Sequence, residues 1–507
     1  MDKSLISIIR AVPSFYILSA ILLLAGVLRL INITHPLLGH HSWRQADTAA
    51  MARNFVEERF NILYPRVDWR GTSSGEVECE FPIYQFVLAA MYRAWGVHET
   101  IGSFLSLIFS LITIVGVYLV SKRVATAAVG LWAAFFFAVL PMPVFFGRTV
   151  MPEALLIAAC TYTVFWFLKW TDSNSLWLLF LSAAALAVAC LIKPPTLYLG
   201  LPLAFLAIRK HGVRALARPD LWIFAAVVMG SIALWYIHAH QFKATTGLTF
   251  GVWEYGSDKW GNWNLAGSWA FWDTVFIRRI PKLLLAYLGL PLLIIGLVRP
   301  PHSAEEKVFS LWLAGMLVFI VVVAKGVFVH DYYLLPASVP ICYFLGKATA
   351  WGLSKDRHQA RWLRAFFAFC IIGLLIVSLK TYGKWLRQES PAKSPAFQVA
   401  QAAWRELPGK ALVLAVDKGD PMMLYYSEKK GWRSFPRDLT ARFVATLAAQ
   451  GADYILGVHK DFADDNAMGN LERLLDQYEV VLNNGSFFII RLDGKNQKDP
   501  ITPRTRP

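Results

Sequence analysis

The chain has 507 residues, of which 56% are hydrophobic and only 17% carry a charge. The surface of a soluble domain needs more charge than this, so the composition excludes an ordinary soluble protein. The formal net charge is +16, but the cations lie in loops between apolar runs, which argues against a nucleic-acid partner. The five cysteines are scattered and indicate no disulfide framework.

Long apolar runs predict a polytopic α-helical membrane protein with about eleven transmembrane helices. The first run, Ser14–Ile33, has spanning length and no cleavage site, so we expect a membrane helix rather than a signal peptide. The stretch Phe81–Gly96 is interrupted by Gln85 and Arg93, and we expect it to lie along the membrane interface. The other predicted spans are Ile101–Val120, Ala125–Phe146, Pro152–Leu168, Leu176–Ile192, Thr196–Ile208, Leu221–Ile237, Leu283–Val298, Val308–Ala324, Tyr332–Ala350 and Ala365–Leu379.

Charge alternates from one loop to the next, which predicts the orientation of the chain. The positive-inside rule makes the loops rich in Lys and Arg cytoplasmic. These loops hold Lys3 and Arg10, Lys122 and Arg123, RKHGVRALAR from Arg209, Arg299 and Lys307, and KDRHQARWLR from Lys355. The N-terminus is then cytoplasmic and the long first loop is outside. In a Gram-negative bacterium the chain would lie in the cytoplasmic (inner) membrane and expose this loop to the periplasm.

The composition changes after Leu379. ALVLAV, DYILGV, YEVVL and SFFIIRL alternate with helical stretches such as DLTARFVATLAAQ, which predicts a small α/β domain over residues 381–507. The span count places this domain outside the cytoplasm. A transmembrane domain over residues 1–380 would include the first external loop, residues 34–100. Because the C-terminal segment shows no phosphate-binding loop and no catalytic cluster, we expect an accessory or acceptor-docking role.

The stretch HHSWRQADTAAMARNF, directly after the first span, predicts a helix. Ser42 and Gln45 have the spacing of a capping box. Arg44 and Asp47 are three residues apart, so they share a face and can neutralise each other. The helix would carry Asp47 to the membrane surface, where a lipid-borne substrate presents its headgroup. The alternative is a solvated helix that lies on the lipid headgroups.

Ionisable residues gather at the external ends of several predicted spans. Each has an ordinary explanation by itself, since charged loop residues are common near headgroups. Together they indicate a site that handles an anion with a metal or a proton. They are Arg44, Asp47, Glu78, Glu80, Arg148, Glu153, Lys193, Lys325, His330 and Asp331.

Five motifs follow the first span in order: WRQADTAAMARNF, EFPIYQFVLAAMYRAWG, RTVMPEALL, LIKPPTLYLGLP and HDYYLLP. With these motifs the first 380 residues resemble the polytopic GT-C glycosyltransferases. The nearest branch is family 39 with the aminoarabinose-transferase-like enzymes, which include protein O-mannosyltransferases. The resemblance implies a polyprenyl-phosphate sugar as donor, inversion at the sugar, and a glycan, lipid or protein as acceptor. It implies no organic cofactor.

The resemblance also assigns roles to single residues. Asp47 matches the acid of the first external loop, the general base. Glu80 matches a carboxylate that holds a divalent metal (Mg, Mn or Zn) in some members, and Glu153 matches a further acid. Lys193 and the HDYYLLP segment, with His330 and Tyr333, match positions near the donor phosphate.

Elementary chemistry supports this assignment. A carboxylate that accepts the proton of a sugar hydroxyl lowers the barrier to its attack. Arg148, Lys193 and a metal at Glu80 could stabilise the charge that develops on the departing phosphate, and Arg44 is a further candidate for binding the donor. His238 and His240 stand beside the tryptophan-rich loop GVWEYGSDKWGNWNLAGSWAFW. They could complete a metal site, although interfacial anchoring is the alternative role of that loop.

Two other functions compete with sugar transfer. A transporter or flippase for lipid-linked sugars predicts internal repeats and charges near the bilayer midplane, and neither is seen. An O-antigen-type polymerase or ligase predicts a large external loop, whereas the largest external portion here is C-terminal. The sequence leaves open the sugar, the acceptor, the polyprenyl length, the metal dependence and the oligomeric state.

Overall fold

The computed structural model describes residues 13–251, 260–354, 361–463 and 465–492. Lys3, Arg10, the start of the KDRHQARWLR segment and residues 252–259 of the tryptophan-rich loop lie outside the described residues. The chain divides into two compact units. The first contains Met1–Ile33, Ser103–His238 and Gly251–Lys384, and the second contains Thr34–Gly102, Ala239–Phe250 and Trp385–Pro507.

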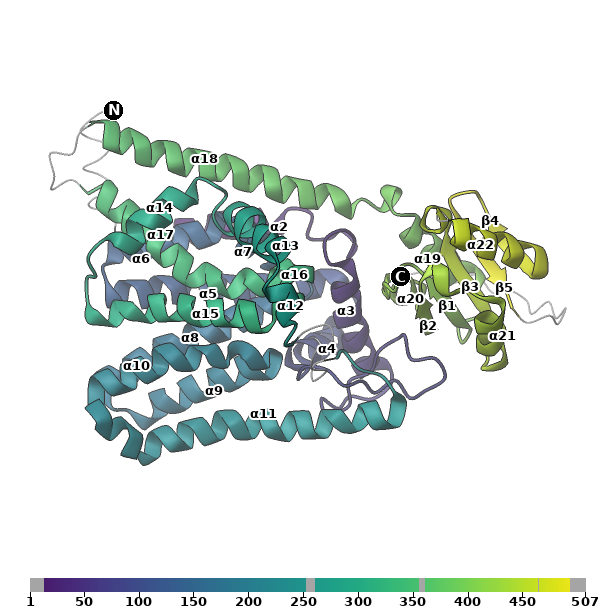
Figure 1. Ribbon diagram of the computed structural model, residues 1–507, viewed down its shortest axis with the longest axis horizontal. Helices are drawn as coiled ribbons and strands as arrows, with labels where there is room; N and C mark the ends of the chain where they lie inside the picture. The colour runs from purple at the N-terminus through teal and green to yellow at the C-terminus, as the bar shows by residue number, and fades with distance from the viewer. Residues whose placement is uncertain (1–12, 252–259, 355–360, 464, 493–507) are drawn as a thin grey trace. The chain divides into compact units, whose positions relative to one another are not determined.

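The first unit is helical, and in Figure 1 its two long helices α11 (Pro219–Thr246) and α18 (Arg361–Leu386) lie along opposite edges of the helical bundle. Both leave most of their apolar residues exposed, as expected for helices that face lipid. The other α-helices are α2 (Ser14–Leu30), α5 (Glu99–Val124), α6 (Ala127–Val139), α7 (Pro141–Phe146), α8 (Glu153–Ser173), α9 (Leu176–Ile192), α10 (Gly200–His211), α12 (Trp263–Ala266), α13 (Trp269–Trp272), α14 (Gly289–Val298), α15 (Lys307–Val322), α16 (Ala324–Val329) and α17 (Ser338–Gly352). Shorter turns are η1 (Pro194–Leu199), η2 (Gly212–Ala217), η4 (Ala304–Glu306) and η5 (Asp331–Ala337), and η3 (Asp273–Leu284) is a π-helix.

Every predicted span overlaps a helix, and α9 has the predicted bounds. Among the described residues, four helices are long and apolar enough to cross a membrane, namely α5, α8, α11 and the helix that includes α18. A fifth candidate is the pair Trp269–Leu284 and Gly289–Val298, bent by 98°. Three more apolar helices, α2, α6 and α9, are shorter. The helical membrane character is therefore supported, and the number of about eleven spans stays a prediction.

A buried arginine explains how the turn before α8 is held. The backbone is extended at Leu140, between α6 and α7, so carbonyl groups there lack helical partners. Arg29 of α2 is fully buried, and a buried guanidinium is tolerated only when its N–H groups are bonded. It donates to Ser110 Oγ (2.8 Å) and to the carbonyls of Ala138 (3.1 Å), Pro143 (3.0 Å) and Phe137 (3.4 Å). These bonds fix the segment that leads to Arg148 and Glu153.

The second unit contains a five-stranded sheet in the order β2-β1-β3-β5-β4. β1 (Leu412–Val416) is parallel to β2 (Lys430–Ser434) and β3 (Tyr454–Val458), and β5 (Phe487–Arg491) is antiparallel to β3 and to β4 (Glu479–Asn483). The predicted apolar strands coincide with β1, β3, β4 and β5. The sequence analysis missed β2, because its residues KGWRS show no apolar alternation.

Helices cover both faces of this sheet (Figure 1). α21 (Ala441–Ala449) and α22 (Asp465–Gln477) bury their apolar residues in one cluster with Leu414, Ile455 and Phe488 of the strands. α19 (Pro395–Glu406) contacts β3 and β5, and α20 (Met422–Ser427) contacts β1. The short turns of this part are η6 (Arg387–Glu389), η7 (Pro391–Lys393), η8 (Pro436–Asp438) and η9 (His459–Phe462).

The first external loop belongs to the second unit. Its helices are α3 (Ser42–Glu57) and α4 (Ile83–Trp95), and α3 contacts both α4 and α20. Backbone bonds join the loop to the edge strand β2: Gly71 N donates to Gly431 O (2.7 Å), and Gly431 N donates to Asp68 O (3.1 Å). The sequence analysis grouped this loop with residues 1–380, and that division into functional domains stays a prediction.

Candidate active site

Helix α3 begins at Ser42, one residue earlier than a capping box with Ser42 as the N-cap residue requires. The residue before the helix is His41, in the left-handed region at φ 56°, and no side chain caps the helix. The predicted capping box is therefore wrong. Its two side chains are used elsewhere: the Ser42 hydroxyl donates to Asp420 Oδ2 (2.9 Å), and Gln45 Nε2 donates to the carbonyl of His40 (3.3 Å).

Asp47 is buried in α3, with 1% of its surface exposed. Its Oδ1 accepts a hydrogen bond from Trp69 Nε1 (2.9 Å). Its Oδ2 is buried and has no hydrogen-bond partner among the described residues. Residues 44–55 of α3 are all buried, so the alternative of a solvated helix is wrong. A carboxylate whose one oxygen is fixed by a hydrogen bond and whose other oxygen accepts none is suited to accept a proton.

Arg44 pairs with Glu80, with 2.8 Å between Nη2 and Oε1. Among the described residues no ion pair joins Asp47 to Arg44, although the charge of Arg44 still acts on the Asp47 carboxylate. Glu80 precedes α4 and is reached only after the loop folds back on α3. Local spacing therefore did not indicate the residue with which Arg44 forms its ion pair.

Burial raises the pKa of Asp47 to about 6, because water no longer solvates the charged form. Arg433, the hydrogen bond from Trp69 and the charge of Arg44 lower this pKa in part, and Asp420 raises it. A carboxyl group with this pKa is ionised at neutral pH and basic enough to take a proton, which is the property of a general base.

Glu78 lies beside the predicted metal ligand His240. Their atoms Oε1 and Nδ1 are 2.7 Å apart, and Glu78 Oε2 accepts a hydrogen bond from Thr249 (2.5 Å). An imidazole nitrogen and a carboxylate oxygen are ligand types that zinc takes. The pair thus brings two such ligand types together, although both Glu78 oxygens already have partners, as Glu80 Oε1 has in Arg44. Glu80 and His240 as metal ligands stay predictions, and the sequence analysis did not assign Glu78 to the metal.

In the first unit, Lys193 and Glu153 form a buried ion pair of 2.9 Å. The Lys193 ammonium also lies over the rings of Tyr332 and Tyr333, 4.5 and 4.4 Å from their centroids. His330 stacks on both tyrosines, at 5.4 and 6.0 Å. The predicted residues of three separate turns therefore meet in one cluster. Glu153 Oε2 is buried and lacks a hydrogen-bond partner among the described residues.

The structure distributes the predicted site residues over both units. Arg148 lies in the first unit, is buried, and donates to the carbonyl of Asn32 (2.7 Å). The second unit holds Asp47 with Arg44, Glu80 and His240. The sequence analysis missed Trp69 and Arg433, because neither belongs to a motif. The only local signal was a tryptophan in the charged loop VDWRG.

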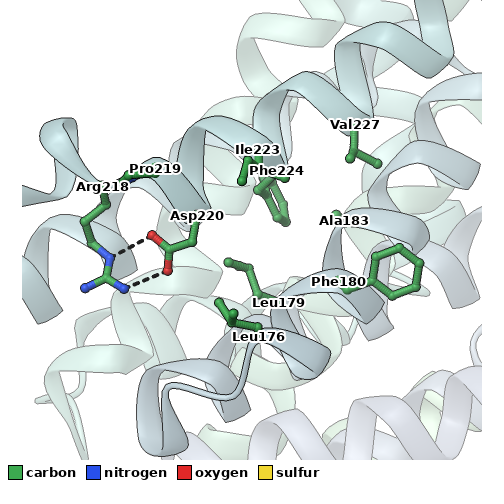
Figure 2. Close-up of a pocket in the computed structure, with 10 residues that line it drawn as sticks. All are labelled: Leu176, Leu179, Phe180, Ala183, Arg218, Pro219, Asp220, Ile223, Phe224 and Val227. Atoms are coloured by element: carbon green, nitrogen blue, oxygen red, sulfur yellow. Dashed lines mark hydrogen bonds and ion pairs between the residues drawn. The ribbon is translucent and has the colours of Figure 1, made fainter.

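A cavity of about 470 Å³ lies between α9 and α11 (Figure 2). Apolar side chains such as Leu179, Phe180 and Phe224 line it, and the ion pair of Arg218 with Asp220 closes one end. None of the predicted site residues lines this cavity. Its lining suits hydrocarbon better than a sugar.

Comparison with known proteins identifies the fold. Residues 80–248 match the family described as dolichyl-phosphate-mannose-protein mannosyltransferase. The structure of ArnT from Cupriavidus metallidurans bound to undecaprenyl phosphate is similar, with a TM-score of 0.65 and 13% identity over 93% of this chain and 97% of that chain. The chain has the GT-C glycosyltransferase fold. The predicted resemblance is thereby confirmed.

Other GT-C structures agree. The Archaeoglobus fulgidus oligosaccharyltransferase tethered with an acceptor peptide has a TM-score of 0.57 and 11% identity, over 88% of this chain and 69% of that chain. A complex of that enzyme with Zn and sulfate has a TM-score of 0.53 and 13% identity, over 93% and 72%. No curated protein sequence matches the chain. The fold and the matched family are those of glycosyltransferases.

Proposed function

We propose that this GT-C chain transfers a sugar from a polyprenyl-phosphate donor to an acceptor, with inversion and with Asp47 as general base. The observation that carries the proposal is the state of Asp47. It is buried, Trp69 holds its Oδ1, and its Oδ2 has no hydrogen-bond partner among the described residues. The undecaprenyl phosphate bound to ArnT and the dolichyl phosphate in the family description support the donor class.

The reaction requires one proton transfer and one displacement. The acceptor hydroxyl attacks the anomeric carbon from the face opposite the phosphate, and Asp47 takes the hydroxyl proton as the new C–O bond forms. The bond from the anomeric carbon to the phosphate oxygen breaks, and its electron pair leaves with the polyprenyl phosphate. Attack from the opposite face inverts the anomeric centre. Burial of Asp47 excludes water that would compete as a nucleophile.

For the departing phosphate we propose Lys193 and Arg148 as the cations, with Glu153, His330 and Tyr333 holding Lys193 in place. The support is the geometry of the cluster: a buried ammonium paired with one carboxylate oxygen and resting on two aromatic faces. Such a cation is partly desolvated, so its attraction to a phosphate is stronger than in water.

For a divalent metal we propose Glu78 and His240 as protein ligands. Their adjacency and the zinc in the oligosaccharyltransferase complex support this choice. A bound metal would supply positive charge near the phosphate. Arg44, which pairs with Glu80, would be a further cation for the phosphate.

We also propose a bacterial inner-membrane location, with the first loop and the C-terminal domain both periplasmic and a cell-envelope glycan such as lipopolysaccharide as the product. The backbone bonds of Gly71 with Gly431 support one common side, because segments joined by hydrogen bonds cannot lie on opposite faces of a membrane. The predicted topology agrees, because it places an even number of spans between the first loop and the C-terminal domain.

The test is sugar transfer by purified protein from a panel of polyprenyl-phosphate sugars, with donor binding measured alongside. Asp47→Asn keeps the size of the side chain but cannot take the proton, so transfer should fall by about two to four orders of magnitude. Glu57→Gln, a half-exposed acid of the same helix, is the matched control and should stay active. Near-normal transfer by Asp47→Asn would remove this residue from the mechanism.

A further inference from the structure

Trp69 is held on two sides within the second unit. The Arg433 guanidinium lies over its ring, 4.1 Å from the centroid. Phe250 packs against it in a T-shaped arrangement, with ring centroids 5.6 Å apart. A tryptophan confined in this way presents its N–H in one fixed direction, because the ring cannot rotate without losing both contacts.

Arg433 reaches this position through the pairing of the loop with the sheet. It lies in β2, the edge strand that Asp68 and Gly71 cover by backbone hydrogen bonds. Gly71 has φ 57°, and a Cβ atom there would stand 2.7 Å from the Trp432 ring nitrogen. Arg433 Nη1 also donates to the carbonyl of Gly419 (2.9 Å), which limits the motion of the guanidinium.

The fixed N–H of Trp69 points at Asp47 and bonds Oδ1 at 2.9 Å. A carboxylate on a helix can otherwise rotate and offer either oxygen to a neighbour. With Oδ1 engaged, Oδ2 is the oxygen left for a substrate proton. The direction of the basic lone pair is therefore set by a residue outside α3.

We infer that Trp69 and Arg433 are positioning residues for Asp47, so that the C-terminal domain completes the catalytic base instead of serving only as an accessory. The inference rests on the proposed role of Asp47. It assigns to β2 a part in the reaction that neither the fold nor the family motifs indicate.

The charged groups around Asp47 predict how its pKa changes when Trp69 or Arg433 is replaced. Arg433 faces it from β2, Arg44 from α3, and Asp420 from the turn after β1. The positive charge of Arg433 and the N–H of Trp69 both stabilise the ionised carboxylate, and their loss should raise the pKa of Asp47 further. The acid limb of the rate profile would then move to higher pH, since a base works only when it is ionised.

The experiment measures transfer against pH for full-length protein carrying Trp69→Phe, Arg433→Gln or Arg433→Lys. Trp69→Phe keeps a ring for Arg433 and removes only the N–H. We expect the acid limb of Trp69→Phe and Arg433→Gln to move up by about 1 pH unit, which is about a tenfold loss of transfer well below the limb. Arg433→Lys keeps the charge, so its limb should stay closer to that of the native protein.

Matched controls come from the same chain. Trp222→Phe removes an exposed tryptophan N–H that bonds the carbonyl of Leu216. Arg437→Gln removes an exposed guanidinium that lies over Phe435. Both should leave the limb in place. Thermal unfolding of each variant in detergent checks that it is folded.

The outcomes separate the inference from the proposed function. If Asp47→Asn is inactive but the limb stays fixed in both Trp69→Phe and Arg433→Gln, the inference is overturned and the general base stands. An equal loss at every pH, accompanied by a lower unfolding temperature, also overturns it, because the two residues would then be structural. If Asp47→Asn stays active, the proposed function itself fails.

Discussion

Replacement of Lys193 tests the cluster of the first unit most directly. Lys193→Gln removes the ammonium that pairs with Glu153 and rests on Tyr332 and Tyr333. If Lys193 contacts the donor phosphate, the lost charge-assisted contact is worth about 1.5–3 kcal/mol, or about a tenfold to hundredfold loss in kcat/KM for the donor. The measurement is sugar transfer at varied donor concentration with purified protein.

The same replacement also disturbs the fold, and the two effects must be separated. Glu153 is 1% exposed, so without Lys193 it becomes an uncompensated buried charge, at a cost of about 3–5 kcal/mol of stability. The double variant Lys193→Gln with Glu153→Gln removes both charges. We expect its unfolding temperature to recover toward the native value while the donor KM stays raised.

A second buried pair, Lys347 with Glu306, is the matched control. Its single variant Lys347→Gln should also lower the unfolding temperature, for the same physical reason, but should leave the donor KM unchanged in the folded protein. A Lys193→Gln, Glu153→Gln variant that is stable and has a native donor KM would refute the reasoning and leave this pair with a purely structural role.

Three further predictions concern acids of the second unit. Transfer should fall as pH drops through about 6, where Asp47 becomes protonated, and a pH–rate profile checks this. Burial would raise the pKa of Asp68, but the charges of Lys430 and Arg53 outweigh burial and lower this pKa to about 2. The ion pairs of Asp68 therefore stabilise the fold above about pH 4, and this stabilisation is lost as pH falls toward 2. Asp68→Asn should cost about 3–5 kcal/mol of stability, seen as a lower unfolding temperature at pH 7. Burial and neighbouring carboxylates raise the pKa of Asp417 to about 7, so the stability of the fold falls as pH rises from about 4 toward 7. Asp417→Asn should therefore raise the unfolding temperature at pH 8 and leave it almost unchanged near pH 4. An equal gain at pH 4 and pH 8 would contradict this prediction.

The sequence by itself determined the elements whose burial follows from local composition. The apolar runs predicted the helices, including α9 with its bounds, because a segment that faces lipid must satisfy its backbone within a helix. Runs of apolar residues predicted β1, β3 and β5, whose side chains are mostly buried, and also β4, an edge strand with no buried residue. Ordered motifs identified the GT-C fold and singled out Asp47, Glu153 and Lys193.

Only the tertiary structure decided which groups are partners. Ser42 bonds Asp420 instead of capping α3, and Arg44 forms its ion pair with Glu80 and not with Asp47. β2 is a strand because Val413 and the loop residue Gly71 bond its backbone, although its own residues show no strand pattern. The partner of a charged side chain depends on which other charges are buried with it when distant segments meet. The Coulomb attraction between two desolvated charges is stronger than the attraction between exposed residues three or four positions apart on one helix, which is all that spacing can reveal.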